Sequence, residues 1–598
     1  MTSYLYADTW SAGLVLAAGM VSFAAFLGLG LMALRLARLV LPSPFREVTA
    51  ALLGILIASL AVQLIAMTPY ATVPVLRGLW WVSTGTGLIA LAIVRPRLWP
   101  ASTAPVPKLA LALAATAGAV NLIAAIVPST KIDELYYHML TPARIVFDHG
   151  LQPYRQPIEA AVLPQMTFQI LAAPLHALEL PDAPNIVSWA LGLLLVWMGW
   201  RLLAERKDAS TLSYCLVAAI PCGAYPVVFH VTGGAHAFCD LALAPAVLAL
   251  FFADRIAATG GPRGFAATVS LLAWAAASSK ISLLPIAVAI LALAAFEASR
   301  QARATSQATF PWLAALIAPW IVFGAPLAVW SWAYTGAPLG PLLSGLFGSN
   351  FYATTAFAEY AELSRVNGRS PLFFFDFDNA AALSPLIWLA ALGLLACRAA
   401  PTRVRLTGGV LLLIQTVIVL WLLPYHVRFL GGLPYALAIA GALWLPAQWA
   451  DKRRLLAAAV ALGSVPWLAG QAAYASQFVP LVVGLDTRDD FHRKRIAMFD
   501  DFRKLDALLP PNAVLLAPGM RIAAVHAPRP TIFTVADGAP GQIPFLLAPG
   551  ADPAHAVPDG YRAGRVAYVN ERARVNVYRR WWVPPDVNRL TVVELERL

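Results

Sequence analysis

Charged residues are scarce in this chain. Only 12% of its 598 residues are Asp, Glu, Lys or Arg, whereas a soluble domain usually carries about 25%. At the same time 60% of the residues are hydrophobic, and the mean hydropathy is +0.69. This balance excludes an ordinary soluble protein and predicts an integral membrane protein that crosses the bilayer several times.

Cysteine is equally sparse, and several catalytic motifs are missing. All four cysteines lie in or beside apolar segments and none lies in the polar C-terminal part, so no disulfide framework is indicated. The sequence contains no HExxH, CxxC, Walker A or GxSxG motif. Metalloprotease, ATPase and serine-hydrolase activities are therefore unsupported. Residues 4–12 contain an acid but no Lys or Arg, which argues against a cleavable signal peptide.

Long apolar runs dominate the first 475 residues. A helix needs roughly 20 apolar residues to cross a membrane. We expect about fourteen spans, near residues 11–34, 48–68, 76–94, 108–127, 184–203, 212–230, 240–256, 265–279, 282–296, 311–332, 380–397, 407–424, 430–448 and 455–473. The pair 265–279 and 282–296 is short enough to be tilted or broken. The apolar stretch 160–178 is interrupted by prolines and glutamines, so we expect a re-entrant or interfacial helix there.

The distribution of basic residues predicts the orientation. The loops on one predicted side hold nineteen Lys and Arg residues, and the opposite loops hold eight. By the positive-inside rule the richer side is cytoplasmic. The N-terminus, the loops 128–183 and 333–379 and the tail from about residue 475 then lie outside. The net charge of +12 thus reports orientation and does not indicate nucleic-acid binding. The Ala- and Arg-rich composition suggests a bacterial plasma membrane, with a periplasm or cell-wall space outside.

The tail differs in character from the rest of the chain. It is polar and is punctuated by two Pro-Pro pairs. Residues 491–509 have the pattern of a charged amphipathic helix, and 513–516, 531–535, 565–569 and 590–595 have that of short strands. The fold prediction is an α-helical polytopic membrane protein with a small C-terminal α/β extracytoplasmic domain at 475–598. Residues 1–104 would form additional N-terminal helices before a membrane module at 105–474.

The leading functional candidate is the acidic pair Asp133 and Glu134, which follows an apolar segment on the predicted outer side. A carboxylate can take the proton of an attacking hydroxyl. Adjacent helical residues diverge by about 100°, so the two acids are expected to have different roles. They could instead be solvated acids that cap the following helix. Tyr136 and His138 follow at once, in an aromatic stretch typical of a lipid interface.

Three more charged residues occur at the predicted outer face. Asp240 follows His236 and a Thr-Gly-Gly turn, and it could be catalytic or could simply cap the next span. Lys280 lies between two short apolar segments, and Arg428 follows His426 at the start of another. Such cations could hold a lipid phosphate. They could equally extend along the span to reach the interface.

Together these segments resemble the GT-C superfamily of polyprenyl-phosphate-sugar-dependent glycosyltransferases, including the protein mannosyltransferase and aminoarabinose transferase groups. Residues 133–138, 235–245, 278–285 and 428–434 carry the resemblance, which covers roughly residues 105–475. Each motif is degenerate, so the resemblance rests on the order of the motifs and on their common predicted side of the membrane. Relatives often have two acids in the second motif, where this chain has Asp240 with His236 nearby.

The resemblance implies a function and a set of roles. Asp133 would be the base, with Glu134 beside it and Asp240 as the second acid. Lys280 and Arg428 would lie near the lipid phosphate, and Tyr136, His138, His236 and His426 would contact substrate. A polyprenyl-phosphate-linked donor and a cell-envelope glycan, lipid or protein acceptor are implied. Some members need a divalent metal and others do not, so metal dependence stays open.

Other functions remain compatible with the sequence. A transporter or flippase for a lipid-linked glycan would more often place ions near the midplane within broken spans, whereas the acids here cluster at one face. A ligase or polymerase that joins whole glycans would share the same motifs. A non-catalytic scaffold could use the outer tail to bind a partner.

Overall fold

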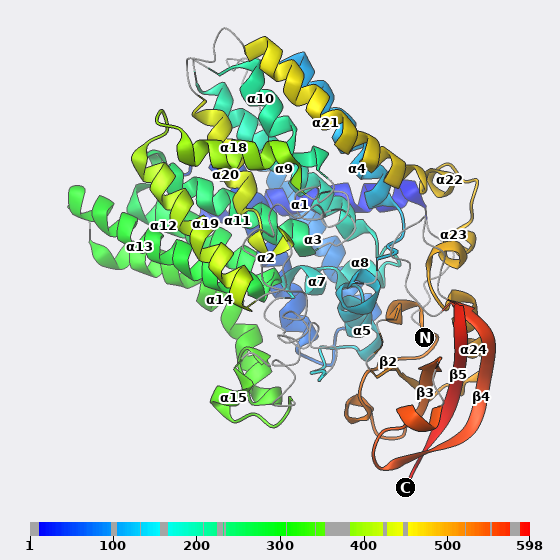
Figure 1. Cartoon of the computed structure of the whole chain (residues 1–598). Coiled ribbons are helices and arrows are strands. Elements are labelled where there is room, and N and C mark those ends of the chain that lie inside the picture. The colour runs from blue at the N-terminus through cyan, green and yellow to red at the C-terminus, as the bar shows by residue number, and fades with distance from the viewer. Residues whose placement is uncertain are drawn as a thin grey trace.

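The structure is a computed structural model in which most of the chain can be described. The described residues are 11–96, 105–131, 133–155, 166–206, 209–223, 226, 231, 235–306, 308–340, 343–352, 383–422, 427–445, 453–518, 520, 522–550, 553–574 and 587–598. Apolar helices make up the bulk of the molecule, and a small sheet lies at one end of it (Figure 1).

The long helices follow the apolar runs of the sequence. They are α1 (Ala12–Leu36), α2 (Phe45–Ala66), α3 (Val73–Val94), α4 (Lys108–Ile126), α9 (Ala183–Ala204), α11 (Ala235–Phe251), α12 (Ala253–Ser279), α13 (Leu284–Ala304), α14 (Thr309–Thr335), α19 (Thr402–Leu422) and α21 (Arg453–Ser476). Shorter apolar helices are α10 (Thr211–Ala218), α18 (Pro385–Ala396) and α20 (Leu433–Leu443). Each of the fourteen predicted segments thus contains a helix.

The protein is a multi-pass helical membrane protein. In the described part of the chain, nine helices are long and apolar enough to cross a bilayer, or up to ten if a bent pair counts as one span. The expected number of about fourteen therefore stays a prediction, as do the domain boundaries and the side on which each loop lies. The bent pair is formed by α11 and α12, whose axes differ by 95°.

Helix α12 consists of two helical pieces. The sequence suggested a loop between spans ending at 256 and beginning at 265, and the helical chain from Ala253 to Ser279 is broken inside that interval. The break is at Gly261, whose φ of 67° and ψ of 179° are not helical, and Pro262 follows it. Proline removes a backbone donor and glycine tolerates positive φ, so these two residues end the first piece and start the second in a new direction.

The interfacial segment in the outer loop forms two short helices. Helices α7 (Thr167–Leu171) and α8 (Ala173–Ala177) have five residues each. A five-residue α-helix is only about 7.5 Å long, far below the thickness of a bilayer. The described part of this segment therefore does not span, as expected from its prolines and glutamines; residues 156–165 lie outside the described part.

The first three helices pack closely through glycines. A Cβ atom on Gly30 of α1 would lie 1.7 Å from the carbonyl oxygen of Ala50 in α2, and one on Gly54 would lie 1.7 Å from that of Phe26. Small residues let helix backbones approach closely where lipid offers no hydrophobic driving force. These contacts hold the N-terminal helices together as a unit.

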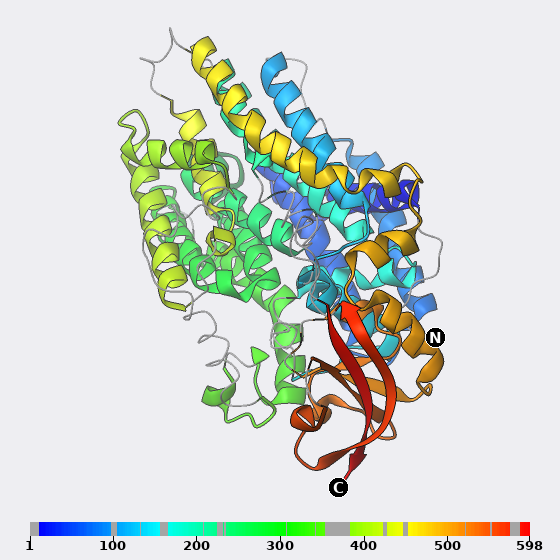
Figure 2. The ribbon, with the colours of Figure 1, turned by 45° about the vertical axis from the view of Figure 1, so that its right-hand side comes forward.

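The C-terminal part is built on one five-stranded sheet. Its strands are β1 (Ala513–Leu516), β2 (Thr531–Ile532), β3 (Ile543–Pro549), β4 (Tyr561–Arg574) and β5 (Val587–Arg597), in the order β2-β1-β3-β5-β4. The strands β1, β2 and β3 pair in parallel, with Leu515 opposite Thr531 and Phe545, whereas β5 runs antiparallel to both of its neighbours. Figure 2 shows the sheet at the end of the helical bundle, next to the C-terminus.

Four of the strands were predicted from the sequence, and β3 was not. The expected helix at 491–509 is present as two helices, α23 (Arg488–Arg495) and α24 (Phe499–Leu508). They are separated at Met498, which has a left-handed φ of 60°. Strand β3 lacks the alternation of a half-exposed strand because Phe545, Leu546 and Leu547 are all buried between its two neighbours.

Replacing Gly30 with Ala should destabilise the protein by about 1–3 kcal/mol, since the new methyl group would collide with the α2 backbone. The thermal midpoint of the purified protein, followed by size-exclusion chromatography after heating, would report the loss. Gly85 of α3 is the matched control, because no atom lies within 4 Å of its Cβ position. An equal midpoint for Gly30→Ala and Gly85→Ala would contradict the close α1–α2 contact.

Candidate functional site

The acidic pair lies on an unusual turn. Residues Glu134–His138 form the π-helix η1, in which the N–H of Met139 donates to the carbonyl of Glu134 over 2.8 Å. Single π-turns occur frequently at functional sites. Asp133 begins this turn and is half-buried, whereas Glu134 is only 4% exposed. The two acids therefore have different environments, in line with the prediction of separate roles.

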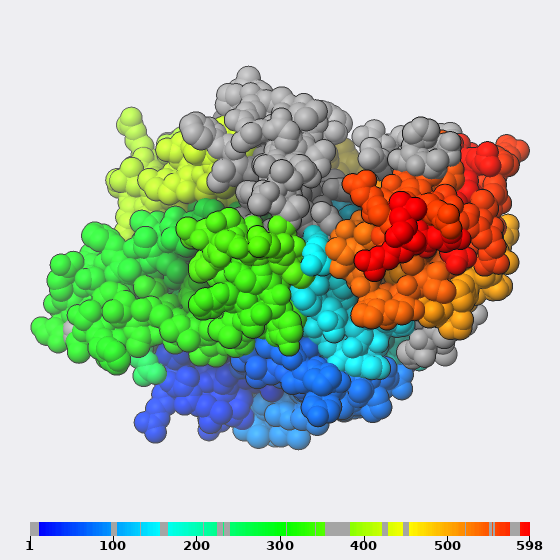
Figure 3. Space-filling model, turned by 90° about the horizontal axis from the view of Figure 1, so that it is seen from below, coloured from blue at the N-terminus to red at the C-terminus, as the bar shows by residue number. Residues whose placement is uncertain are grey.

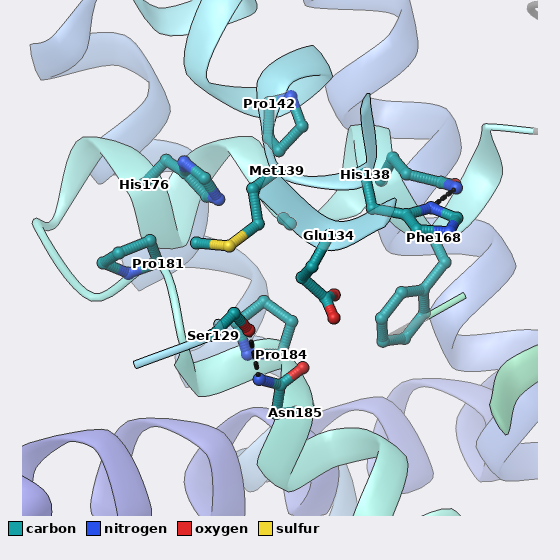
Figure 4. Close-up of a pocket in the computed structure, with 12 residues that line it drawn as sticks. Ser129, Glu134, His138, Met139, Pro142, Phe168, His176, Pro181, Pro184 and Asn185 are labelled. Carbon is teal, nitrogen blue, oxygen red and sulfur yellow. Dashed lines mark hydrogen bonds between the residues drawn. The ribbon is translucent and has the colours of Figure 1, made fainter. Parts of the chain in front are cut away.

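Glu134 faces a small polar cavity (Figure 4). The cavity measures about 20 Å³, enough for one water molecule. It is lined by the first part of the outer loop, by α7 and α8 and by the start of α9, with the polar residues Ser129, Glu134, His138, Gln169, His176 and Asn185.

Hydrogen bonds fix several side chains around this cavity. Gln169 Nε2 lies 2.8 Å from His138 Nδ1, and Asn185 Nδ2 donates to Ser129 Oγ over 3.3 Å. The backbone N–H of Ser129 donates to Asp182 Oδ1 over 3.1 Å. Among the described residues, none donates a hydrogen bond to Glu134 Oε2 or to Asp182 Oδ2. Buried polar atoms of this kind are costly unless water or a ligand satisfies them.

Burial changes the protonation of these groups. It raises the pKa of Glu134 well above its usual value, against the lowering effect of Lys131 and with help from Asp182 and Asp133. Burial also raises the pKa of Asp182 to about 6, although Arg488 and the Ser129 N–H oppose it, and lowers that of His176 to about 3. Burial thus favours the protonated form of Glu134 and keeps His176 neutral.

A second cluster forms where three other predicted segments meet. Asp240 of α11 is fully buried, and its carbonyl oxygen would lie 1.8 Å from a Cβ on Gly432. Lys280, 9% exposed, places its Nζ 4.8 Å from the ring centre of Phe429. Phe429 belongs to the 3₁₀-helix η8 (Val427–Leu430), which also contains Arg428. The backbone thus brings the Asp240, Lys280 and Arg428 segments together.

An aromatic pair links the two clusters. Phe168 of α7 lines the Glu134 cavity and stacks on Phe238, with ring centres 5.7 Å apart and planes inclined by 27°. Phe238 precedes Asp240 by two residues on the same helix. The acidic loop and the Asp240 region are therefore neighbours.

Three of the predicted site residues are not fully described by the structure. His426 is not described, and for His236 and Arg428 only the backbone is. Tyr136 lies away from the cavity: its ring packs edge-to-face on Phe533 of the C-terminal domain, with 5.0 Å between centres. The substrate contacts expected of these residues stay predictions.

The sequence did not single out Gln169, His176 and Asp182. Asp182 carried a signal, since it directly precedes an Ala-Pro that starts a long apolar run. Gln169 and His176 lie in the stretch that was interpreted as interfacial for its polar interruptions. Gln169 and His176 lie beside Glu134 only because the chain folds back and brings that stretch next to η1.

The described residues contain no group of three or more His, Cys, Asp or Glu side chains placed to hold a metal ion. Glu134, His138 and His176 surround the same cavity without forming such a set.

The C-terminal domain packs directly on the acidic loop. Leu135, Tyr136 and Leu140 share one hydrophobic core with Phe502 and Phe545 of the domain. In addition the buried Arg144 of α5 (Leu140–Asp148) donates to the carbonyl of Thr531 in β2. Figure 3 shows the outer-loop helices, in cyan, next to the orange and red domain.

Comparison with known proteins adds no relative to this picture. No protein-family model matches the chain, and no curated protein is significantly similar to it.

Replacing Asp182 with Asn should change how stability depends on pH. A folded-state pKa of about 6 exceeds the unfolded value of about 3.9. The folded protein thus binds the proton more tightly, and this stabilisation is lost as pH rises from about 4 to about 6. The loss amounts to about 3 kcal/mol.

We therefore expect the thermal midpoint of Asp182→Asn, relative to wild type, to rise across that interval and then level off. Asp559→Asn, at an exposed turn, is the control and should show no such rise. A constant difference between wild type and Asp182→Asn from pH 4 to 7 would contradict the buried, proton-binding state of Asp182.

Proposed function

We propose that the protein is a membrane glycosyltransferase that moves a sugar from a polyprenyl-phosphate-linked donor to an acceptor on the extracytoplasmic side. The single observation that carries the proposal is the proximity of two polar clusters. The Asp133–Glu134 turn and the Asp240–Lys280 region lie next to each other through the Phe168–Phe238 stack. They are also the segments that resemble GT-C enzymes.

The two acids suit different parts of a transfer reaction. Asp133 is half-buried and begins the turn, so it is our choice for the base. The acceptor hydroxyl attacks the anomeric carbon, its proton passes to the Asp133 carboxylate, and the bond from that carbon to the phosphate oxygen breaks. The polyprenyl phosphate leaves with the electron pair, and the configuration at the anomeric carbon inverts.

The cationic residues suit the leaving group. Phosphate gains negative charge as the bond breaks, and a fixed cation in a low-dielectric site stabilises that charge. Lys280 is held at the edge of its helix above the Phe429 ring, and Arg428 belongs to the same 3₁₀-helix as Phe429. Both residues are therefore candidates for contact with the phosphate.

A flippase for a lipid-linked glycan is the second candidate. It is favoured by the burial of Asp240 on a helix of a strongly bent pair, because transporters place charged residues near broken helices. A flippase would move the donor intact, whereas a transferase, ligase or polymerase would release polyprenyl phosphate. Chemical analysis of the lipid product therefore separates the two.

Asp133→Asn should reduce the release of polyprenyl phosphate by about a hundredfold or more, the usual contribution of a general base. The assay would use purified protein in nanodiscs, radiolabelled polyprenyl-phosphate hexoses and pentoses, and envelope extract as the acceptor source. Asp559→Asn is again the control. Full activity of Asp133→Asn would remove Asp133 as the base, and intact donors throughout would favour the flippase.

Glu134→Gln should by contrast keep activity within a few-fold of wild type. Burial raises the pKa of Glu134 and so favours its protonated form, and glutamine offers a similar shape with a donor and an acceptor but no charge. The same release assay measures this variant. A loss as large as that of Asp133→Asn would show that Glu134 works as a carboxylate and would exchange the proposed roles of the two acids.

A further inference from the structure

A large apolar groove lies among the membrane helices, and none of its lining residues lines the Glu134 cavity. It measures about 540 Å³ and runs between α1, α2, α12 and α14. Its size falls within the range of ligand-binding cavities. In the part of the chain that the structure describes, Arg263 is the one charged residue that lines it.

The local sequence explains why this space is open. Small side chains line much of it, among them Ala33, Ala267, Ala314 and Ala318. The break at Gly261 turns the start of α12 away from the straight path of the helix. The kink keeps α12 from following its neighbours, and the small side chains leave the resulting space unfilled, so a groove remains.

The groove lies at the end of the helices that points away from the C-terminal domain. It is lined by the end of α1 and the first half of α14. The opposite end of α14 leads towards Phe351, where Arg155 donates to the carbonyls of both Phe351 and Ala536. By the predicted orientation the groove therefore belongs to the cytoplasmic half of the membrane.

The groove opens towards lipid. Helix α14 exposes Phe310 by 79% and Val322 by 49%, and both residues line the groove. Exposed apolar side chains along a membrane-crossing helix face acyl chains. An occupant must therefore be apolar over most of its length and must enter from the bilayer.

The mouth of the groove is basic. Arg263 is exposed and donates to the carbonyl of Ala37 over 3.4 Å, which places it at the end of α1. Arg35 and Arg38 are exposed on either side of Ala37. The acid nearest in sequence, Glu47, is fully buried and pairs with Arg46 at 2.5 Å. Arg263, at the polar end of this apolar groove, suits a phosphate that carries a hydrocarbon chain. Arg35 and Arg38 add positive charge to the same end of α1.

We propose that this groove binds an anionic phospholipid of the leaflet opposite the C-terminal domain. One acyl chain lies between α12 and α14, and the headgroup phosphate meets Arg263. The site is separate from the proposed glycosyl-transfer site and does not depend on that activity. It would hold the N-terminal helices against α12 and α14 through a lipid that bridges them.

Native mass spectrometry of the full-length protein, released from nanodiscs of equal phosphatidylglycerol and phosphatidylcholine, tests the proposal. Wild type should retain phosphatidylglycerol in preference to phosphatidylcholine. Arg263→Gln should lower that retention about fivefold. Arg454→Gln, an exposed arginine at the start of α21, is the matched control and should retain as much as wild type.

A second variant tests the groove without changing charge. Ala314→Phe places a large ring in the cavity from an exposed position on α14, and it should also lower lipid retention. Equal retention of the two lipids by wild type would overturn the proposal, as would unchanged retention in either variant. A dimer without bound lipid would overturn it as well and would identify a second copy of the chain as the occupant.

Discussion

The docking of the outer-loop turn into the core of the C-terminal domain is the contact on which the candidate site depends. Leu135, Tyr136 and Leu140 are each at most 8% exposed and pack with Phe502 and Phe545 of the domain. Full burial of one such side chain stabilises a structure by about 1.5–3 kcal/mol. Because Asp133 and Glu134 directly precede these residues, the same packing that orders the domain also sets the position of the acids.

This arrangement gives the domain a structural task. The core of the domain is completed by residues of the membrane part, so the two parts share one hydrophobic cluster. Polar contacts reinforce it: Arg144 reaches the Thr531 carbonyl, and Arg155 bonds the carboxylate of Asp537 through its backbone N–H at 3.1 Å. The sheet therefore supports the loop.

The acids also differ in burial. Burial raises the pKa of Glu134, and the nearby Asp182 and Asp133 raise it further. Asp133, one residue away, is half-buried. Two adjacent carboxyl groups thus lie in different surroundings, because successive helical side chains diverge by about 100°.

The sequence by itself determined the class of protein, the places of the apolar helices and four of the five strands. The class of protein follows from the scarcity of charge. The helices and strands follow from local periodicity, and in a membrane few long-range contacts can override such a local pattern. It also singled out Asp133, Glu134, Asp240 and Lys280 as candidates, because charges beside apolar runs are conspicuous.

Tertiary structure alone decided which residues surround Glu134 and how burial shifts the pKa of Asp182 and Glu134. It also decided that the middle of β3 is buried, a position without a periodic signature, and that the loop completes the core of the domain. Each of these depends on residues tens to hundreds of positions apart being brought into contact, which no local pattern specifies.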